Sequence, residues 1–252
     1  MEALSPIKFE RFIYLKEVES TNQYALSLQN ETPQEPTCFY SFSQTLGRGQ
    51  IGRFWYTGEE KNIALTYLWP DANIDVKDQF VISMSFALAI YDFLMQQGVQ
   101  NVSIKWPNDI YVGDKKVAGI LIQNSLRSSN ITTSYLGVGL NINERSFPID
   151  IPNPTSLSLE KSQSYKLVDL VHQLTETAEK RLSQILLRSR SAIEDEYLNR
   201  LYRKDTAHRY LIDAQAYTGI IRGITAEGKL KLEIEGEVRL LNFREVSYLL
   251  DD

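Results

Sequence analysis

The sequence is poor in the residues that build disulfides, metal clusters and histidine-based catalytic sites. Its 252 residues include one cysteine, Cys38, and two histidines, His172 and His208. A single cysteine cannot form an internal disulfide or a thiolate cluster, and two histidines leave little room for a histidine-rich zinc site. Both histidines are expected to be structural, and no Ser-His-Asp or Cys-His arrangement supports nucleophilic hydrolysis.

An excess of positive charge is also missing. The chain has 27 Lys and Arg against 32 Asp and Glu, a formal net charge of −5 and a pI near 5.3. Proteins held to DNA or anionic lipid by bulk charge are basic, so both classes are disfavoured. No signal peptide is evident, and the longest apolar stretch, residues 80–95, is interrupted by Ser83, Ser85 and Asp92. We therefore expect a buried helix there and a cytoplasmic protein.

What is present is the composition of a globular protein, with 43% hydrophobic and 23% charged residues. Apolar periodicity predicts helices after residue 20 and over 78–97, 167–185 and 193–202. Alternating patterns predict strands over 37–42, 62–69, 102–106, 110–112, 116–125 and 133–143. The strand over 62–69 is expected to end at Pro70, and the last two strands are expected to form an antiparallel hairpin.

The pattern of apolar and polar residues changes after Asp205. Short alternating stretches over 216–224, 229–235 and 237–243 are joined by glycine-containing turns and predict a small barrel. We expect two domains, 1–204 and 205–252.

The loop Gly47–Trp55 (GRGQIGRFW) is the most informative segment. Its three glycines within six residues let the backbone approach an anion and present N–H groups to it. Arg48 and Arg53 add planar donors suited to phosphate or carboxylate, and Trp55 adds an apolar lid. A flexible glycine turn with solvated arginines is the alternative. The loop is neither a Walker loop nor a dinucleotide fingerprint, because the strand–loop–helix context is missing.

A second unusual segment is Lys105-Trp-Pro-Asn-Asp109. Pro107 fixes a bend and favours an extended Trp106. Asn108 and Asp109 then lie on a turn between two apolar strands, where they could meet a ligand or a magnesium ion. An Asx turn that joins a hairpin is the alternative.

Two further strands carry polar residues in apolar surroundings. Lys116 opens an apolar strand and would lose hydration unless a fixed anion met it, although a lysine at the sheet edge can also snorkel to water. In Gly137-Val-Gly-Leu-Asn141-Ile-Asn143 two glycines and two asparagines alternate, so they are expected to share one face that a ligand can approach. A strand crowded by a neighbouring element is the alternative.

Together these segments resemble the ordered motifs of the biotin–protein ligases. The resemblance covers roughly residues 10–250 and includes Ser20-Thr21-Asn22, where a plain helix cap is the alternative. It implies an α+β fold: a catalytic domain related to class II aminoacyl-tRNA synthetases, with a mixed sheet flanked by helices, and a C-terminal SH3-like barrel. It also implies an ATP-dependent, AMP-forming ligase. Biotin and MgATP would give biotinyl-5′-AMP and pyrophosphate. A lysine of the biotin carboxyl carrier domain of a carboxylase, such as acetyl-CoA carboxylase, would then form an amide with biotin.

The resemblance also implies roles for individual residues. Lys116, Arg48 and Asp109 would be catalytic, with Asp109 as base for the attacking lysine or as a magnesium ligand. Biotin would be bound by Ser20, Thr21, Asn22, Gln44, Gly47, Arg48, Gly49, Gln50, Lys116 and Gly119. ATP and the adenylate would be bound by Arg48, Gly52, Arg53, Trp55, Asn108, Lys116 and Asn141. ATP, magnesium and biotin would be substrates, with no tightly bound prosthetic group.

Two departures from the family pattern matter. Gln50 stands where many members carry arginine, so one phosphate contact would lose its charge and adenylate retention would change. The segment before residue 20 is too short for a winged helix-turn-helix, so we expect a ligase-only form that does not bind DNA. Members of the family often pair through the central sheet, and the sequence leaves a homodimer open.

Two other functions compete with this interpretation. A lipoate or octanoate ligase would share the fold and the catalytic lysine, but its arginine-rich, triple-glycine loop does not match residues 47–55. A non-catalytic adaptor that only binds a carrier protein is the alternative outside enzymes.

Overall fold

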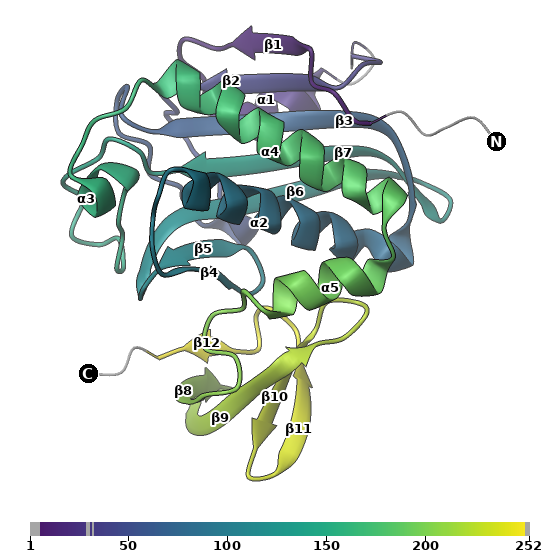
Figure 1. Cartoon of the computed structure of the whole chain (residues 1–252), viewed down its shortest axis with the longest axis vertical. Helices are drawn as coiled ribbons and strands as arrows, with labels where there is room; N and C mark the ends of the chain where they lie inside the picture. Colours follow the sequence, from purple (N-terminus) through teal and green to yellow (C-terminus); the bar gives the residue numbers. More distant parts are fainter. Residues whose placement is uncertain (1–5, 29–30, 32, 250–252) are drawn as a thin grey trace.

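Two β-sheets organise the computed structural model, which describes residues 6–28, 31 and 33–249. The larger sheet has seven strands in the order β1-β2-β3-β7-β6-β5-β4, and the smaller has five in the order β11-β10-β9-β8-β12. The small sheet lies below the large one in Figure 1, with α5 (Arg190–Leu198) between them. The large sheet is thus formed by the first seven strands of the sequence and the small sheet by the last five.

The large sheet is mixed. Its strands are β1 (Arg11–Tyr14), β2 (Thr37–Ser41), β3 (Ile63–Asp75), β4 (Val102–Lys105), β5 (Asp109–Val112), β6 (Lys115–Arg127) and β7 (Asn130–Leu140). Strands β1 and β2 are parallel and all other neighbours are antiparallel. The predicted hairpin of β6 and β7 is confirmed and pairs Leu121 with Gly137.

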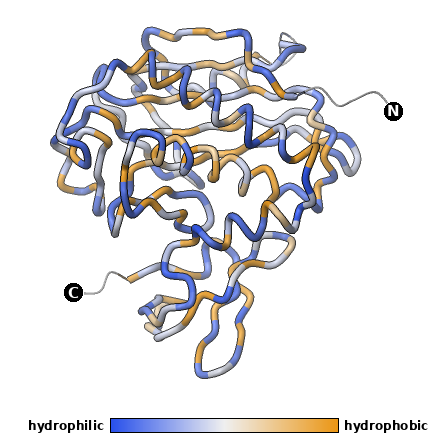
Figure 2. The backbone as a smooth tube through the Cα atoms, in the orientation of Figure 1, coloured by the Kyte–Doolittle hydropathy of each residue, from blue (hydrophilic) through white to orange (hydrophobic). Residues whose placement is uncertain are grey.

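Helices lie on both faces of this sheet. Figure 1 shows α2 (Gln79–Gln96) and α4 (Leu167–Leu187) on one face and α1 (Thr21–Ser27) on the other. The short helix α3 (Leu157–Lys161) and the single turns η2 (Gln50–Gly52) and η3 (Val76–Asp78) lie in connections. In Figure 2, hydrophobic and hydrophilic residues alternate along α4, as expected for a helix with one buried face.

The predicted apolar helix is α2, and it is a core helix. With the preceding turn it is long and apolar enough to cross a membrane by length and composition, but most of it is buried inside the fold. One of its polar interruptions has a structural explanation, because Asp92 accepts a hydrogen bond from Arg181 of α4 at 2.6 Å. The hydroxyl of Ser85 is buried and has no hydrogen-bond partner among the described residues.

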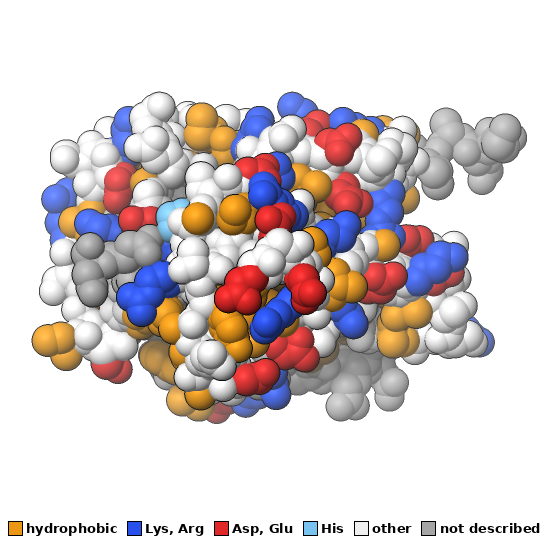
Figure 3. All heavy atoms as spheres, turned by 90° about the horizontal axis from the view of Figure 1, so that it is seen from below, with side chains coloured by type: hydrophobic (Ala, Val, Ile, Leu, Met, Phe, Trp, Pro, Cys, Tyr) orange, Lys and Arg blue, Asp and Glu red, His pale blue; other side chains and the backbone are white. Residues whose placement is uncertain are grey.

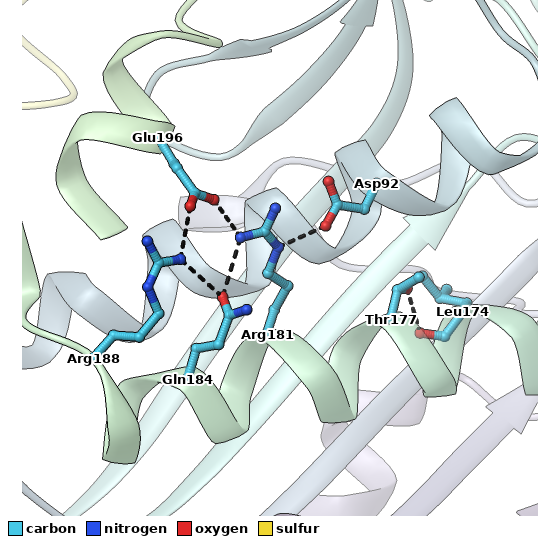
Figure 4. Close-up of polar contacts among 7 residues, drawn as sticks. All are labelled: Asp92, Leu174, Thr177, Arg181, Gln184, Arg188 and Glu196. Carbon is cyan, nitrogen blue, oxygen red and sulfur yellow. Dashed lines mark hydrogen bonds and ion pairs between the residues drawn. The ribbon is translucent and has the colours of Figure 1, made fainter. Parts of the chain in front are cut away.

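Figure 4 shows how ion pairs join α2, α4 and α5. Glu196 of α5 binds Arg181 and also accepts a hydrogen bond from Arg188 at 2.7 Å. Burial alone would raise the pKa of Glu196, but its hydrogen bonds to the two arginines outweigh burial and lower the pKa. The pairing therefore contributes stability at neutral pH, and this contribution is lost as the pH falls through the lowered pKa.

Strand β3 is longer than predicted, because it continues through Pro70 to Asp75. Pro70 pairs with Thr133 of β7, and a bulge precedes the pair Ile74–Ile131. On its other side β2 begins at Thr37, which pairs with Leu68, so the pairing does not reach Pro70. No strand there needs an N–H from Pro70, so proline is tolerated. The prediction that the strand ends at Pro70 is wrong for this reason.

The small sheet is antiparallel and forms the C-terminal barrel. Its strands are β8 (Ala207–Ile212), β9 (Gln215–Ile224), β10 (Leu230–Ile234), β11 (Glu237–Leu241) and β12 (Ser247–Tyr248). Three of the five match the predicted stretches, whereas β8 and β12 were not expected. Buried residues of the barrel and of the large sheet belong to one continuous hydrophobic cluster. A domain division at residue 204 stays a prediction.

The barrel and the large sheet are joined by backbone and side-chain hydrogen bonds. The amide of Ile104 in β4 donates to the carbonyl of Arg200 at 2.8 Å, and the amide of Tyr202 donates to the carbonyl of Ile104 at 2.9 Å. The Trp106 indole donates to the carbonyl of Gly228 at 2.9 Å. Arg200 and Tyr202 belong to the linker between α5 and β8, and this linker thus covers the edge of the sheet. The barrel itself contacts the segment after β4.

Gly228 offers a test of this junction. Its φ is +90°, and a Cβ atom there would lie 2.3 Å from the Phe80 ring of α2. We expect Gly228→Ala to lower the free energy of unfolding by about 2–5 kcal/mol, through backbone strain plus the clash. Urea denaturation measures this. Gly236→Ala is the matched control, because Gly236 has a φ of +85° and a Cβ added there would meet no atom within 4 Å. Equal losses in the two variants would show that the Phe80 contact is unimportant.

Candidate functional site

A cavity of about 790 Å³ lies between the large sheet and the barrel. Its volume falls in the range of small-molecule sites, about 300–1,000 Å³. Strands β5, β6 and β7 contribute its floor, and the start of α1 and the loops around residues 48–56 and 147–154 contribute its walls. Residues 243–248 of the barrel complete the lining. The cavity is therefore built by both sheets.

The structure brings nearly all of the predicted site residues to this cavity. Those that line it are Ser20, Thr21, Asn22, Gln44, Arg48, Gly49, Gln50, Arg53, Trp55, Asn108, Asp109, Lys116, Gly119 and Asn141. Gly47 and Gly52 are not among the lining residues. A Cβ on Gly47 would lie 2.3 Å from the Trp55 carbonyl oxygen, and Gly52 has a φ of +74°. These two glycines shape the loop rather than its cavity surface.

Buried polar side chains form one end of the cavity. Ser20, Thr21 and Asn22 are each less than 5% exposed. The amide of Thr21 donates a hydrogen bond to Oε1 of Gln44 at 2.8 Å. The hydroxyl of Thr66 donates one to Oδ1 of Asn22 at 2.6 Å. Thr66 was missed by the sequence analysis, because it lies in an apolar strand with no motif around it. The result is a preorganised group of donors and acceptors.

Ser20 occupies the N-cap position of α1, but its side chain makes no capping hydrogen bond. The alternative interpretation as a helix cap is therefore confirmed for the position of Ser20, although the side-chain hydrogen bond typical of such a cap is not formed.

Lys116 and Asp109 form an ion pair at the centre of the cavity. The Lys116 ammonium lies 2.6 Å from Oδ1 of Asp109, and the side chains are 29% and 14% exposed. The same ammonium lies 5.2 Å from the centre of the Trp55 ring. The fixed anion that the sequence predicts beside Lys116 is thus Asp109 in this structure, and a ligand anion would compete with it.

Lys105 is a second cation beside Asp109, and the sequence analysis assigned it no role. Its ammonium lies 3.9 Å from Oδ2 of Asp109, 5.1 Å from the Tyr111 ring centre and 4.8 Å from the Tyr248 ring centre. Burial lowers the pKa of Lys105, and the Asp109 carboxylate opposes this shift. The only sequence feature that pointed to Lys105 as a site residue was its position in the segment 105–109.

Positive charge dominates the cavity. Its lining includes Arg48, Arg53, Lys105, Lys116 and Arg244, against the carboxylates of Asp109 and Asp150. Clustered cations in a cleft with low-dielectric walls attract anionic ligands such as phosphates and carboxylates. The overall charge of the chain is negative, so this local field is specific to the cavity.

Glycines in β6 and β7 let two side chains lie directly on the sheet. Gly119 and Gly139 are cross-strand partners, and the Trp55 indole lies over both. A Cβ would lie 2.8 Å from the indole at Gly119 and 2.1 Å from it at Gly139. At Gly137 a Cβ would lie 2.4 Å from Oδ1 of Asn22. The sequence predicts that a ligand can approach this face. In this structure the Trp55 indole and the Asn22 side chain lie on it.

The same prediction is wrong for Asn143. Strand β7 ends at Leu140, so the alternation does not continue that far. Asn141 lines the cavity, where its amide donates to the carbonyl of Thr155 at 2.9 Å. Asn143 instead donates to the carbonyl of Tyr165 at 2.8 Å and is not among the cavity-lining residues.

Gly139→Ala tests whether the position of the Trp55 indole on the sheet matters for function. The new methyl group would displace Trp55, so we expect the adenylate formation that the resemblance implies to slow by about 10-fold or more, because misplacing a binding group by about 1 Å has effects of this size. Pyrophosphate exchange at varied ATP measures this, with a thermal melt to confirm that the variant folds. A wild-type rate in a folded variant would show that the position of Trp55 on the sheet does not matter.

The described residues contain no group of three or more His, Cys, Asp and Glu side chains that could hold a metal. Both oxygens of Asp109 face ammonium groups, at 2.6 Å and 3.9 Å. This surrounding suits a carboxylate that orients cations. Ligation of magnesium by Asp109 stays a prediction.

Comparisons with known proteins agree with this geometry. Residues 14–141 match the model of the biotin/lipoate A/B protein ligase family. The Bifunctional ligase/repressor BirA of Escherichia coli K12 is 27% identical over 231 residues, which are 88% of this chain and 69% of that protein. The Biotin--[acetyl-CoA-carboxylase] ligase of Mycobacterium tuberculosis H37Rv is 26% identical over 209 residues, 82% of this chain and 76% of that protein.

Solved structures show the same fold. The biotin protein ligase from Aquifex aeolicus in complex with biotin and ATP has a TM-score of 0.76 and 23% identity, and the match covers 95% of this chain and 98% of that one. The biotin protein ligase from Leishmania major in complex with biotinyl-5-AMP has a TM-score of 0.63 and 20% identity, covering 92% and 99%. The predicted α+β fold with its C-terminal barrel is confirmed.

Proposed function

Because the chain belongs to the biotin/lipoate A/B protein ligase family, we propose that it activates biotin with ATP and transfers it to a carrier protein. In the first step a biotin carboxylate oxygen attacks the α-phosphorus of ATP. The bond to pyrophosphate breaks, and biotinyl-5′-AMP forms. In the second step a lysine amine of the carrier domain attacks the biotinyl carbonyl carbon. The bond to AMP breaks, a proton is released, and an amide forms.

The observation that carries this proposal is the polar end of the cavity. The ureido ring of biotin has two N–H donors and one carbonyl acceptor, which suit the buried side chains of Ser20, Thr21, Asn22 and Gln44. The dithiolane ring of lipoate has no such groups and would form none of these hydrogen bonds at the polar end. Sites built to hydrogen-bond a substrate reject analogues that lack the bonding groups. Biotin is therefore favoured over lipoate within the family.

The cationic part of the cavity suits the reacting groups. Adenylation moves negative charge onto the pyrophosphate and needs fixed cations rather than a protein nucleophile. Lys116 would hold the biotin carboxylate and then the anhydride oxygens. Arg48 and the backbone of residues 47–50 would meet the carboxylate and the phosphate, with Arg53 near the phosphates. Trp55, Asn108 and Asn141 would hold the adenine and its neighbours.

Asp109 is the candidate base for the second step. Its carboxylate is held by Lys116 in this structure, 2.6 Å away. When Lys116 turns to a bound adenylate, that oxygen becomes available to the ammonium of the acceptor lysine, which must lose a proton to attack. The ion pair thus couples binding of the adenylate to exposure of the base.

One experiment discriminates the candidate functions. The protein is incubated with ATP, an apo carrier domain and either labelled biotin or labelled octanoate or lipoate. We expect covalent labelling with biotin only, and only with ATP. Labelling with octanoate or lipoate but not with biotin would favour a lipoate or octanoate ligase. Carrier binding without labelling would favour an adaptor.

We further expect the protein to act in the cytoplasm on the carrier domain of a biotin-dependent carboxylase, without specific binding to DNA. On the face seen in Figure 3, Lys and Arg side chains are intermingled with Asp and Glu, which gives no continuous basic surface on that face for a phosphate backbone. A homodimer through the large sheet stays a prediction.

A further inference from the structure

The C-terminal barrel contributes side chains to the cavity, and one of them contacts a cation. Tyr248 in β12 lines the cavity opposite Lys105 of the large sheet. We propose that Tyr248 is a positioning residue for adenylation, whose ring, together with that of Tyr111, holds the Lys105 ammonium in place for the phosphates of ATP. This inference rests on the proposed function.

Two aromatic rings hold the ammonium group. The Lys105 ammonium lies 4.8 Å from the Tyr248 ring centre and 5.1 Å from the Tyr111 ring centre, both within the 6 Å typical of cation–π contacts. The hydroxyl oxygen of Tyr248 is buried and has no hydrogen-bond partner among the described residues. The ring, not the hydroxyl, is therefore the part that acts on Lys105.

Other contacts of Lys105 do not fix its position. Its distance of 3.9 Å from Asp109 is too long for a hydrogen bond, and Lys116 is closer to that carboxylate. A lysine side chain has four flexible methylene links and loses rotamer freedom when it is fixed. Since Asp109 is shared, the aromatic rings are the contacts that distinguish one position of Lys105 from others.

The rings are themselves held in place at the junction. Tyr202 of the linker packs on Tyr111 with ring centres 5.2 Å apart and on Tyr248 with ring centres 6.1 Å apart. Its hydroxyl donates to Oδ1 of Asp114 at 2.5 Å. Tyr210 of β8 packs against Tyr248 at 5.3 Å. A cluster of four tyrosines thus transmits the position of the barrel to Lys105.

Lys105 lies where a cation can meet phosphate. Asp109 and Lys116 are its neighbours in the cavity, and Arg53 is close enough to lower its pKa. Mutual repulsion among these cations is relieved when an anion binds between them. Holding Lys105 in advance should therefore favour MgATP, while biotin, bound at the other end, should be little affected.

Tyr248→Leu is the first test, measured by biotin-dependent pyrophosphate exchange. We expect the KM for ATP to rise about 10-fold, a size between those of exposed and desolvated cation–π contacts, and the KM for biotin to stay unchanged. Tyr248→Phe, which retains the ring, should restore the wild-type KM for ATP. Tyr217→Leu is the matched control, because Tyr217 is a barrel tyrosine that contacts a cation, Arg239 at 4.8 Å, but does not line the cavity.

Two further variants separate a positioning role from a structural one. Pentafluorophenylalanine at position 248 keeps the shape of the ring and reverses its quadrupole, so it should raise the KM for ATP as leucine does, even if Tyr248→Leu fails to fold. In a Lys105→Met background, Tyr248→Leu should have no further effect, because the two residues act through one contact.

An unchanged KM for ATP in the fluorinated variant, or effects of Lys105→Met and Tyr248→Leu that multiply, would overturn the proposal while the wild-type enzyme remains a biotin ligase. Absence of biotin-dependent exchange in the wild-type protein would instead overturn the proposed function and this inference together.

Discussion

Lys116→Ala is expected to slow adenylate formation by about 100-fold or more and to leave the protein folded. The ammonium of Lys116 is the cation closest to Asp109 and lies beside the Trp55 ring, at the centre of the cavity. Alanine removes the charge that would meet the biotin carboxylate and the anhydride oxygens. Folding should survive, because the side chain is 29% exposed and Lys105 remains near Asp109.

Biotin-dependent pyrophosphate exchange measures this effect. Lys115→Ala is the matched control, because Lys115 precedes Lys116 in β6 but is exposed and does not line the cavity. A folded Lys116→Ala variant that exchanges pyrophosphate at a rate close to that of the wild type would remove Lys116 from the reacting site.

Asp109→Asn is expected to slow transfer of biotin from preformed biotinyl-5′-AMP to the carrier domain by about 100-fold, the lower range for loss of a general base. Asparagine keeps the shape of the side chain but cannot take a proton from the acceptor lysine. Adenylate formation should decrease less, because Lys116 is still present but loses its ion pair.

Single-turnover transfer, with adenylate supplied, separates the two steps. Asp150→Asn is a useful control, because it removes a carboxylate that lines the same cavity and is expected to have a smaller effect. If Asp109→Asn slowed adenylation alone and transfer proceeded normally, Asp109 would orient Lys116 and would not act as the base.

The sequence predicted the site where the signal is local. The 47–55 loop, the 105–109 segment and the start of β6 each carry their chemistry within a few consecutive residues, and the large sheet brings them together. Thr66 and Tyr248 were not predicted, because each is a single polar residue in an ordinary strand. Tertiary packing brings Thr66 against Asn22 and brings Tyr248 to the cavity. Pro70 shows the same limit for the fold, since proline is tolerated there only because β2 begins opposite Leu68.

The way in which the barrel is joined to the large sheet has a thermodynamic consequence. Detaching the barrel would leave the Trp106 indole without the hydrogen-bond partner it has in the folded protein. It would also divide a continuous hydrophobic cluster. Both parts should therefore melt in one cooperative transition, with equal calorimetric and van't Hoff enthalpies. A junction of this kind does not act as a hinge, so we expect the barrel to keep its place over the cavity when substrates bind and products leave.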